Sequence, residues 1–367
     1  MPTASENRKL RGLNAFPTRQ VAVIGAGMAG ARCAQVLVAA GHAVQVFDKS
    51  RGPGGRLATR RLEWRDRRGL GHTTRLDHGA VSITAASTDF QAFLDEAVRA
   101  GGLAEWQPVL APGSLPLPDA GRHFVPVPEQ PALCRTMLAA TTASWSFAAD
   151  KLHRGPLGWQ VSAGDTRHPA LFDAVVLALP PAQAAALLNP HRPDWAARAA
   201  AVPMQPCWTL MGIAQASEPN AGAAPAWDLA RPASGCLAWV LRNDSRPGRD
   251  RVPGQAHWVV HAQADWSQQN LEQDAEAVRD HLQAALAGWL GRPVDWLHAV
   301  AHRWRYALPP TSKPPGERCW WDAALGLGVC GDFLGRTGAE GAWLSAQALC
   351  AAMQQGIEPR HRRNDEA

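Results

Sequence analysis

The first 80 residues alternate between short apolar segments and glycine-rich or charged connections. Residues 21–24 form an apolar strand, and a helix follows to about Ala40, with Gly41 suited to its end. A second apolar strand covers residues 43–47. This order of strand, helix and strand predicts an α/β fold with a central parallel sheet.

The pattern changes in the middle third, where strand-like segments with several tryptophans are separated by turn-rich stretches. Strands joined by short turns predict an antiparallel sheet. We expect its strands at residues 207–214, 235–241, 257–264 and 300–307. Residues 270–290 have apolar positions at helical spacing and predict a long helix. An apolar strand over residues 325–330 and a helix from about Glu340 to Met353 return to the first pattern.

The turn after the first strand has the spacing G-x-G-x-x-G. Glycine is needed because the backbone must approach a pyrophosphate whose charge lies at the N-terminus of the following helix. An acid at the end of the second strand is placed to accept the ribose hydroxyls of an adenosine. These features predict a dinucleotide site, for NAD or FAD, formed by Gly25, Ala26, Gly27, Met28, Ala29, Gly30, Asp48 and Lys49.

A second glycine pair decides between these two cofactors. Gly54 and Gly55 come six residues after Asp48, and Arg56 follows them. The pair lets another backbone segment close over the cofactor, and the guanidinium of Arg56 can offset the charge of a diphosphate. Dehydrogenases that use NAD rarely need this segment, whereas flavoproteins that bind extended FAD commonly have it. We therefore expect FAD.

The C-terminal strand ends in Gly331 and Asp332. We expect Asp332 to hold the ribityl or phosphate region of FAD, with capping of the next helix as the alternative. The positive end of that helix, including Gly341 and Ala342, is expected to face the pyrimidine edge of the flavin, which gains negative charge on reduction. Cys330 is expected in the core, with covalent flavin attachment as the alternative.

Nucleotide-binding elements at both ends of the chain predict two interleaved domains with the cofactor at their junction. We expect a Rossmann-like FAD-binding domain and a second substrate domain built mainly on an antiparallel sheet. The FAD-binding domain would comprise residues 20–80, 131–182 and 318–355. The substrate domain would comprise residues 81–130 and 183–317, and residues 1–19 and 356–367 would be flexible tails.

Composition narrows the setting of the protein. The 367 residues are 46% hydrophobic, enough for a sizeable core, and no apolar run approaches the roughly 20 residues that cross a bilayer. The net charge of +5 comes from clumped arginines without a nucleic-acid-binding motif, so we expect no nucleic-acid partner. The first nineteen residues contain no apolar signal segment, and seven cysteines without C-x-x-C fit a reducing cytoplasm. No group of residues has metal-ligand spacing.

The chain resembles the FAD-dependent amine oxidase superfamily and, within it, the bacterial renalase-like proteins. The likeness runs from about Gln20 to Met353 and is carried by VAVIGAGMAG, KSRGPGGR, LDHGA, HWVVHAQADWS, HRWRYALP and CGDFLGRTGAEGAWLSA. It implies non-covalent FAD and a two-electron oxidation in which dioxygen is reduced to hydrogen peroxide. Renalases are similar to oxidases of aberrant dihydronicotinamide isomers of NAD(P)H, which they return to NAD(P)+.

The resemblance places a segment beside the flavin ring, formed by Asp77, His78, Gly79 and Ala80. Relatives usually continue with glutamine and an aromatic residue, but this chain has Val81, Ser82 and Ile83, which changes the expected pocket wall and leaves the substrate open.

Four residues are candidates for the reaction: His78, Trp304, Arg305 and Tyr306. Strand alternation places Trp304 and Tyr306 on one face, where either can line the flavin pocket, and Arg305 on the other as a candidate anchor for substrate phosphate. His78 is a candidate catalytic residue or a histidine that satisfies backbone groups. Hydride transfer to a flavin needs alignment more than a base, so the substrate cannot be chosen by finding one.

The leading hypothesis is therefore a renalase-like oxidase acting on a small-molecule substrate and dioxygen. An amine oxidase or desaturase-like flavoenzyme is the enzymatic alternative, and a flavin-binding protein without oxidase activity is the third. The oligomeric state is left open.

Overall fold

The computed structural model describes residues 18–119, 121–216, 226–310 and 316–355. Its central element is a six-stranded sheet in the order β17-β18-β11-β1-β2-β7. The strands are β1 (Gln20–Ile24), β2 (Ala43–Phe47), β7 (Thr142–Ser144), β11 (Ala174–Leu177), β17 (Trp320–Asp322) and β18 (Leu327–Val329). All neighbours pair in parallel except β17, which is antiparallel to β18. β1 and β11 are almost wholly buried, which explains their continuous apolar sequences.

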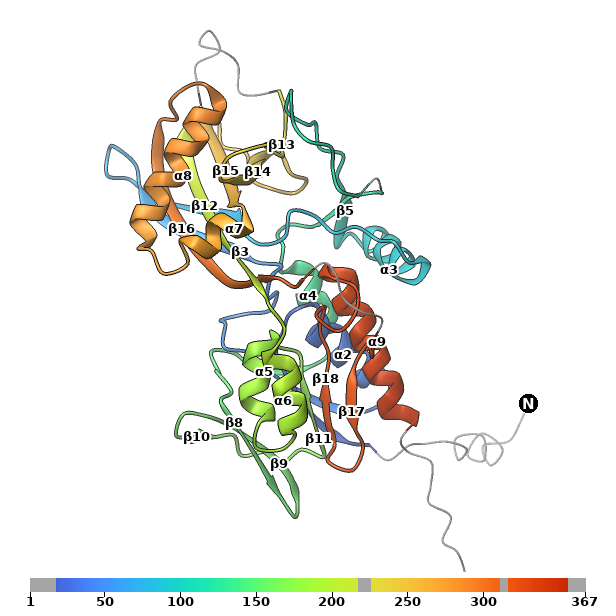
Figure 1. Cartoon of the computed structure of the whole chain (residues 1–367). Helices are drawn as coiled ribbons and strands as arrows, with labels where there is room; N and C mark the ends of the chain where they lie inside the picture. The colour runs from blue at the N-terminus through green and yellow to red at the C-terminus, as the bar shows by residue number, and fades with distance from the viewer. Residues whose placement is uncertain (1–17, 120, 217–225, 311–315, 356–367) are drawn as a thin grey trace, which may run out of the picture.

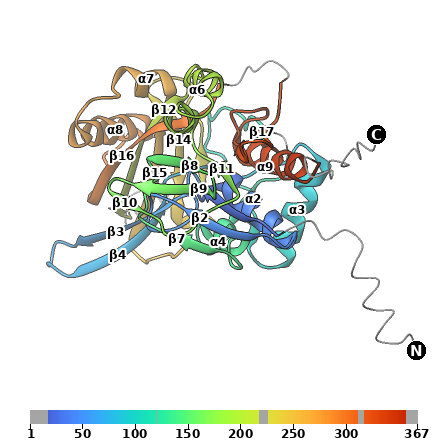
Figure 2. The ribbon, with the colours of Figure 1, turned by 90° about the horizontal axis from the view of Figure 1, so that it is seen from below.

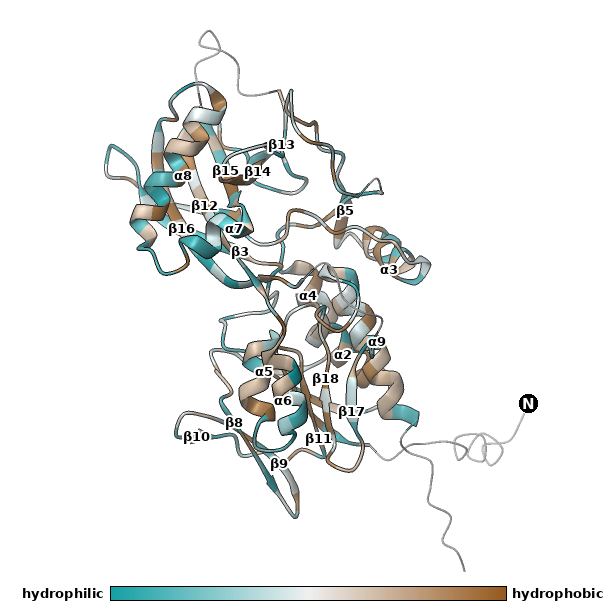
Figure 3. Cartoon of the chain, viewed as in Figure 1, coloured by the Kyte–Doolittle hydropathy of each residue, from teal (hydrophilic) through white to brown (hydrophobic). Residues whose placement is uncertain are grey.

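Helices cover both faces of this sheet (Figure 1). One face carries α2 (Met28–Ala39), α4 (Ala132–Met137) and α9 (Gly338–Gln355), which share a hydrophobic cluster with alternate residues of β1. The opposite face carries α5 (Pro181–Leu188), α6 (Pro193–Ala200) and a small sheet of β8 (Lys151–Gly155), β9 (Gly158–Ala163) and β10 (Thr166–Arg167). Figure 3 shows hydrophobic residues concentrated in α5 and α9.

A second, five-stranded antiparallel sheet has the order β13-β14-β15-β12-β16. Its strands are β12 (Gln205–Gln215), β13 (Leu229–Ala230), β14 (Leu237–Arg242), β15 (Gln255–Ala262) and β16 (Trp296–Leu308). The helices α7 (Ala264–Gln269) and α8 (Ala275–Leu290) follow β15, and α8 packs on one face. The other face packs against the hairpin of β3 (Thr59–Arg65) and β4 (Gly71–Asp77). Figure 2 shows this hairpin at the edge of the molecule.

The remaining elements lie outside the sheets described above. They are α3 (Thr88–Arg99), the strand pair β5 (Leu103–Glu105) and β6 (Phe124–Pro126), and a short 3-10 helix, η1 (Asn243–Ser245). α3 packs through Phe90 and Leu94 into the cluster that contains α2 and α9. Among the described residues, no helix is long and apolar enough to cross a membrane.

The expected fold class, a parallel-sheet domain combined with an antiparallel sheet, is confirmed. The helix expected at residues 270–290 begins later, at Ala275, because the side chain of Asp274 accepts hydrogen bonds from the amides of Glu276 and Ala277 and caps the helix there. The β3–β4 hairpin was not expected, since its sequence reads as an arginine-rich connection.

The domain boundaries remain a prediction, and the hydrophobic clusters refine how the segments pack. The helices α5 and α6, which fall largely within the expected substrate segment 183–317, pack on the parallel sheet. The β3–β4 hairpin, within the expected FAD-binding segment 20–80, packs on the antiparallel sheet. The two expected tails lie outside the described residues, apart from Thr18 and Arg19.

Candidate functional site

The glycine turn between β1 and α2 is packed so tightly that side chains are excluded from it. Gly25 has a φ of +105°, and a Cβ added there would lie 2.4 Å from the carbonyl oxygen of Ala178. A Cβ on Gly30 would lie 1.8 Å from the carbonyl oxygen of Gly25. The turn therefore requires glycine at both positions, and it leads directly into the helix.

The second glycine pair lies directly on this turn. The amide of Gly54 donates a hydrogen bond of 2.9 Å to the carbonyl of Ala26, and Gly54 forms a bridge with Gly27. Gly55 has a φ of +56°, and a Cβ there would lie 3.1 Å from the Cα of Gly27. Two backbone segments thus approach each other without side chains between them, which suits a cradle for a phosphate chain.

The N-terminus of α2 adds a partial positive charge to this cradle. Gly27 occupies the cap position, and neither a capping side chain nor an acidic residue occupies the first turn, which includes Met28, Ala29 and Gly30. The amides of this turn and the helix dipole are therefore available to a negatively charged group.

Asp48 holds the cradle together from the end of β2. One carboxylate oxygen accepts a 2.7 Å hydrogen bond from the amide of Ala26, and the other accepts one of 2.7 Å from the amide of Ser50. Each oxygen can accept a further bond, so the carboxylate can still receive ribose hydroxyls. The neighbouring Lys49 is exposed.

Arg56 and Asp332 pair with each other, which changes the separate roles expected for them. The guanidinium donates two hydrogen bonds to the carboxylate, of 2.9 and 2.6 Å, and a third of 3.1 Å to the carbonyl of Ala307. Asp332 also accepts a 3.2 Å bond from the amide of Gly338, the first residue of α9, so it contacts the helix start as the capping alternative expects. Part of the charge of Arg56 is thus balanced by Asp332, although its side chain remains 35% exposed.

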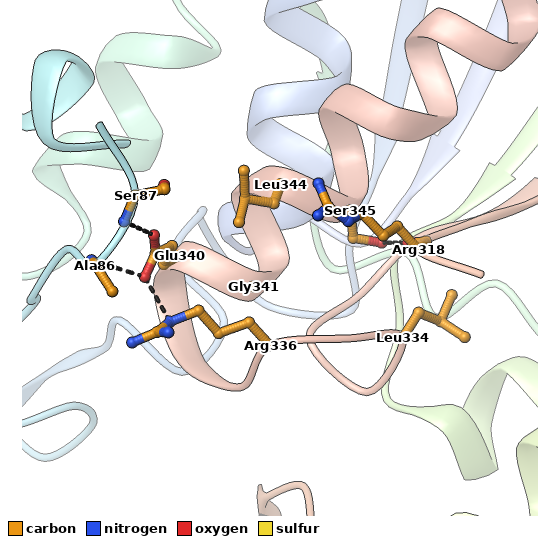
Figure 4. A pocket seen from close by; sticks show the side chains of 9 residues that line it. All are labelled: Ala86, Ser87, Arg318, Leu334, Arg336, Glu340, Gly341, Leu344 and Ser345. Carbon is orange, nitrogen blue, oxygen red and sulfur yellow. Dashed lines mark hydrogen bonds and ion pairs between the residues drawn. The ribbon is translucent and has the colours of Figure 1, made fainter. Parts of the chain in front are cut away.

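The start of α9 contains a residue that the sequence analysis missed, Glu340. Its buried carboxylate accepts hydrogen bonds from the amides of Ala86 (3.1 Å) and Ser87 (2.7 Å), just before α3, and forms an ion pair with Arg336 (Figure 4). A Cβ on Gly341 would lie 1.4 Å from the carbonyl oxygen of Arg336, so the loop before α9 lies against its first turn. A single acidic residue among small residues in this turn was the available signal.

A cavity of about 240 Å³ opens beside this turn (Figure 4). It is lined by Ala86, Ser87, Arg318, Leu334, Arg336, Glu340, Gly341, Leu344 and Ser345. Ala342, on the next position of the helix, is buried in the core instead.

The carboxylate of Asp77 binds several other side chains of the protein. This carboxylate, 1% exposed, pairs with Arg246 at 3.1 Å and with Arg249 at 2.6 Å, and accepts a hydrogen bond from the hydroxyl of Thr59 at 2.5 Å. Both arginines come from the turn between β14 and β15 and are also buried. The carboxylate is therefore occupied by side chains of the protein and joins the hairpin to the antiparallel sheet, while contact of this segment with a flavin stays a prediction.

Gly79 and Ala80 lie along the segment after the second glycine pair. A Cβ on Gly79 would lie 2.0 Å from the carbonyl oxygen of Arg56, and the amide of Ala80 donates a 3.0 Å hydrogen bond to that same carbonyl. The two segments are thus adjacent, and both contact β16 through Arg56 and His78.

His78 belongs to a group that we call the histidine cluster: His78, His261 and His302. The ring of His78 stacks on Trp304 at 5.0 Å and meets the ring of His302 at 4.8 Å, and the indole of Trp304 donates a 3.1 Å hydrogen bond to the carbonyl of His78. Within the described part of the chain, the buried Nδ1 of His78 and Nε2 of His261 have no hydrogen-bond partner.

The histidine cluster is uncharged at neutral pH. Burial, followed by the charges of His302 and Arg60, lowers the pKa of His78 to about 3. Burial and then Arg60 lower the pKa of His302 to about 4, and burial and then Arg246 lower that of His261 to about 4. At neutral pH the three rings can therefore form hydrogen bonds, but none of them carries a second ring proton.

Two other candidates, Arg305 and Tyr306, also lie on β16. Arg305 is exposed and forms an ion pair of 2.6 Å with Glu272, which also binds Arg303. Arg305 is thus turned away from Trp304 and already has a partner, so the structure does not favour it as a phosphate anchor. Tyr306 is partly buried, two residues beyond Trp304.

The three unusual residues after Ala80 contact other parts of the protein. Ile83 lies in the core beside α2 and α3, and the carbonyl of Val81 accepts a 2.6 Å hydrogen bond from Arg246. Ser82 bonds to His123 at 2.9 Å. Cys330 is fully buried in the core. In the described segments, no group of three or more His, Cys, Asp or Glu residues could hold a metal ion.

Comparisons with known proteins agree with this geometry. Residues 23–97 match the family model of an NAD(P)-binding Rossmann-like domain. A structure assigned as a protoporphyrinogen oxidase from Exiguobacterium sp. 255-15 aligns with a TM-score of 0.66 and 10% identity, over 93% of this chain and 100% of that one.

Two amine-oxidising proteins are similar in the same way. Cyclohexylamine oxidase from Brevibacterium oxydans IH-35A aligns with a TM-score of 0.61 and 14% identity, over 92% of this chain and 99% of that one. A redesigned putrescine oxidase aligns with a TM-score of 0.59 and 13% identity, over 92% and 99%. The chain therefore has the fold of these oxidase structures, and its residues 23–97 match a Rossmann-like domain.

Proposed function

We propose that this chain binds FAD and acts as a flavin-dependent oxidoreductase. The observation that carries the proposal is the joining of two glycine segments at the start of α2, with Asp48 fixed below them. A nicotinamide cofactor needs the first segment only, whereas the second, Gly54 and Gly55, supports a longer and more enclosed dinucleotide.

The chain's own residues would act by binding and positioning. FAD, when bound, supplies a ring that accepts a pair of electrons from a substrate and passes them to dioxygen. The amides of the glycine turn and α2 would hold its diphosphate, and Asp48 would accept its ribose hydroxyls. The start of α9 would place a partial positive charge toward the ring.

We further propose that the substrate is a dihydronicotinamide isomer of NAD(P)H, oxidised to NAD(P)+ with release of hydrogen peroxide. The support is the resemblance to renalase-like proteins together with the chemistry of the histidine cluster. Its rings are neutral, and the nearest carboxylate, Asp77, is occupied by two arginines. A site whose histidines are weak bases, with pKa values of about 3 to 4, suits hydride transfer, in which the chain must align the substrate and exclude water.

Amine oxidation is the second candidate. Cyclohexylamine oxidase and putrescine oxidase share this fold, and an uncharged aromatic wall around His78 and Trp304 would favour the neutral form of an amine. The same wall thus serves either substrate, and a direct comparison must separate them.

One experiment tests the function. The purified protein is expected to be yellow, and it is mixed anaerobically with dihydronicotinamide isomers, with NADH itself or with amines. Rapid bleaching of the flavin band by the isomers, followed by peroxide formation when air is admitted, is the expected result. Bleaching by amines alone would favour the second candidate. A flavin that none of them reduces would indicate a binding protein, and a colourless protein that binds NAD but not FAD would refute the cofactor.

A further inference from the structure

One cation beside the histidine cluster has no assigned role, Arg60 on β3. The hairpin lies along β16 in a constant register, which fixes its position. Near the tip of the hairpin, Arg67 pairs with Asp295. Three residues earlier on β3, the ring of Trp64 stacks on His298. At the base of the hairpin, His78 stacks on Trp304.

The side-chain alternation of β3 puts Arg60 on the face that meets β16. Leu62 and Trp64 are buried against the antiparallel sheet, and Arg60 lies on the same side two residues before Leu62. Continuing the register from the Trp64–His298 contact brings Arg60 opposite His302. The effect of its charge on both His302 and His78 agrees with this placement.

The neighbouring arginines are all engaged, and Arg60 is not. Arg61, on the opposite face of β3, pairs with Glu63, while Arg303 and Arg305 share Glu272. Across the described residues, the side chain of Arg60 forms no hydrogen bond or ion pair, and it is exposed. Asp77, the carboxylate next to His78, is already bound by two other arginines.

We propose that Arg60 binds the diphosphate of the dinucleotide substrate, next to the histidine cluster where its nicotinamide ring would be oxidised. A planar guanidinium is suited to phosphate oxygens, and that of Arg60 is exposed and has no partner among the described residues. The inference rests on the proposed function, since it names the group by which that substrate is held. It replaces Arg305 as the anchor.

The test measures binding apart from oxidation. Flavin-loaded wild type, Arg60→Ala, Arg60→Lys and Arg61→Ala are titrated by calorimetry with NAD+ and with nicotinamide riboside, which has no phosphate. Arg60→Ala is expected to weaken NAD+ binding by about 10- to 100-fold, Arg60→Lys by less, and Arg61→Ala not at all. The difference between wild type and Arg60→Ala should shrink in high salt, and the riboside should bind all four proteins equally.

The proposal is wrong if wild type does not bind NAD+, if Arg60→Ala binds it equally, or if the variant loses the riboside to the same extent. Flavin content measured on each protein shows whether Arg60 supports the cofactor instead. Failure of the proposed function has another signature, because the flavin of the wild type would then stay oxidised with every dihydronicotinamide isomer, whatever the titrations show.

Discussion

Replacing Asp77 by asparagine separates a structural role from a cofactor-binding role. The change keeps the shape of the side chain and removes one negative charge from between Arg246 and Arg249, whose side chains are 0% and 4% exposed. Breaking a buried ion pair in this way costs about 3–5 kcal/mol, because the remaining charges stay in a water-free environment without compensation. We expect the free energy of unfolding to fall by that amount.

Denaturant unfolding followed by tryptophan fluorescence measures this loss, with flavin content measured on the same samples. Glu63→Gln is the matched control, since it removes a carboxylate from an exposed pair on the same hairpin and should change the unfolding midpoint little. The reasoning would be refuted if Asp77→Asn were as stable as the control. Normal stability combined with loss of flavin would restore Asp77 to the cofactor site.

Three further predictions concern the cradle and the histidine cluster. Asp48→Ala should weaken FAD binding by about 10- to 150-fold, from the loss of roughly 1.5–3 kcal/mol of charge-assisted hydrogen bonds, without gaining NADP affinity; titration of the apoprotein with both cofactors decides this. Gly30→Ala should yield protein without flavin, because the added Cβ would lie 1.8 Å from the carbonyl oxygen of Gly25, whereas Gly288→Ala, with nothing within 4 Å, should retain it. The pKa of His78 is about 3 in the folded protein and near 6.5 in the unfolded chain, so the unfolded chain binds a proton that the folded protein does not. The free energy of unfolding should therefore fall as the pH drops from about 6.5 toward 4, by up to about 1.4 kcal/mol per pH unit. Denaturant titrations at pH 7 and pH 5 should show this fall, and a smaller one in His78→Asn; equal slopes would contradict the burial of that ring.

Local requirements made the cradle predictable. The close contacts of Gly25 and Gly30 lie within or beside one turn, so the need for glycine at both positions can be read from a short stretch of sequence. The apolar segments that became β1 and β11 were recognisable because strands buried on both faces must be apolar throughout.

Partners distant in sequence were not predictable in this way. Asp77 and Arg246 are separated by 169 positions, and Glu340 lies 253 positions from Ser87, so no local pattern connects them. Arg305 shows the converse, because alternation gave the correct face of β16 but not the glutamate already bound to it. Pairing of charges depends on the tertiary arrangement, and it decided which arginine was left available.

The pairing of Arg56 with Asp332 has a consequence for how the protein folds during its synthesis. The ribosome delivers the glycine turn, Asp48 and Arg56 first, but the acid that anchors Arg56 lies 276 positions further on, just after the strand β18 that pairs with β11. Because domains fold as their segments emerge, the nascent chain has only part of the cradle while the antiparallel sheet is synthesised. A cofactor that needs both halves would therefore bind only after Asp332 and β18 have been synthesised.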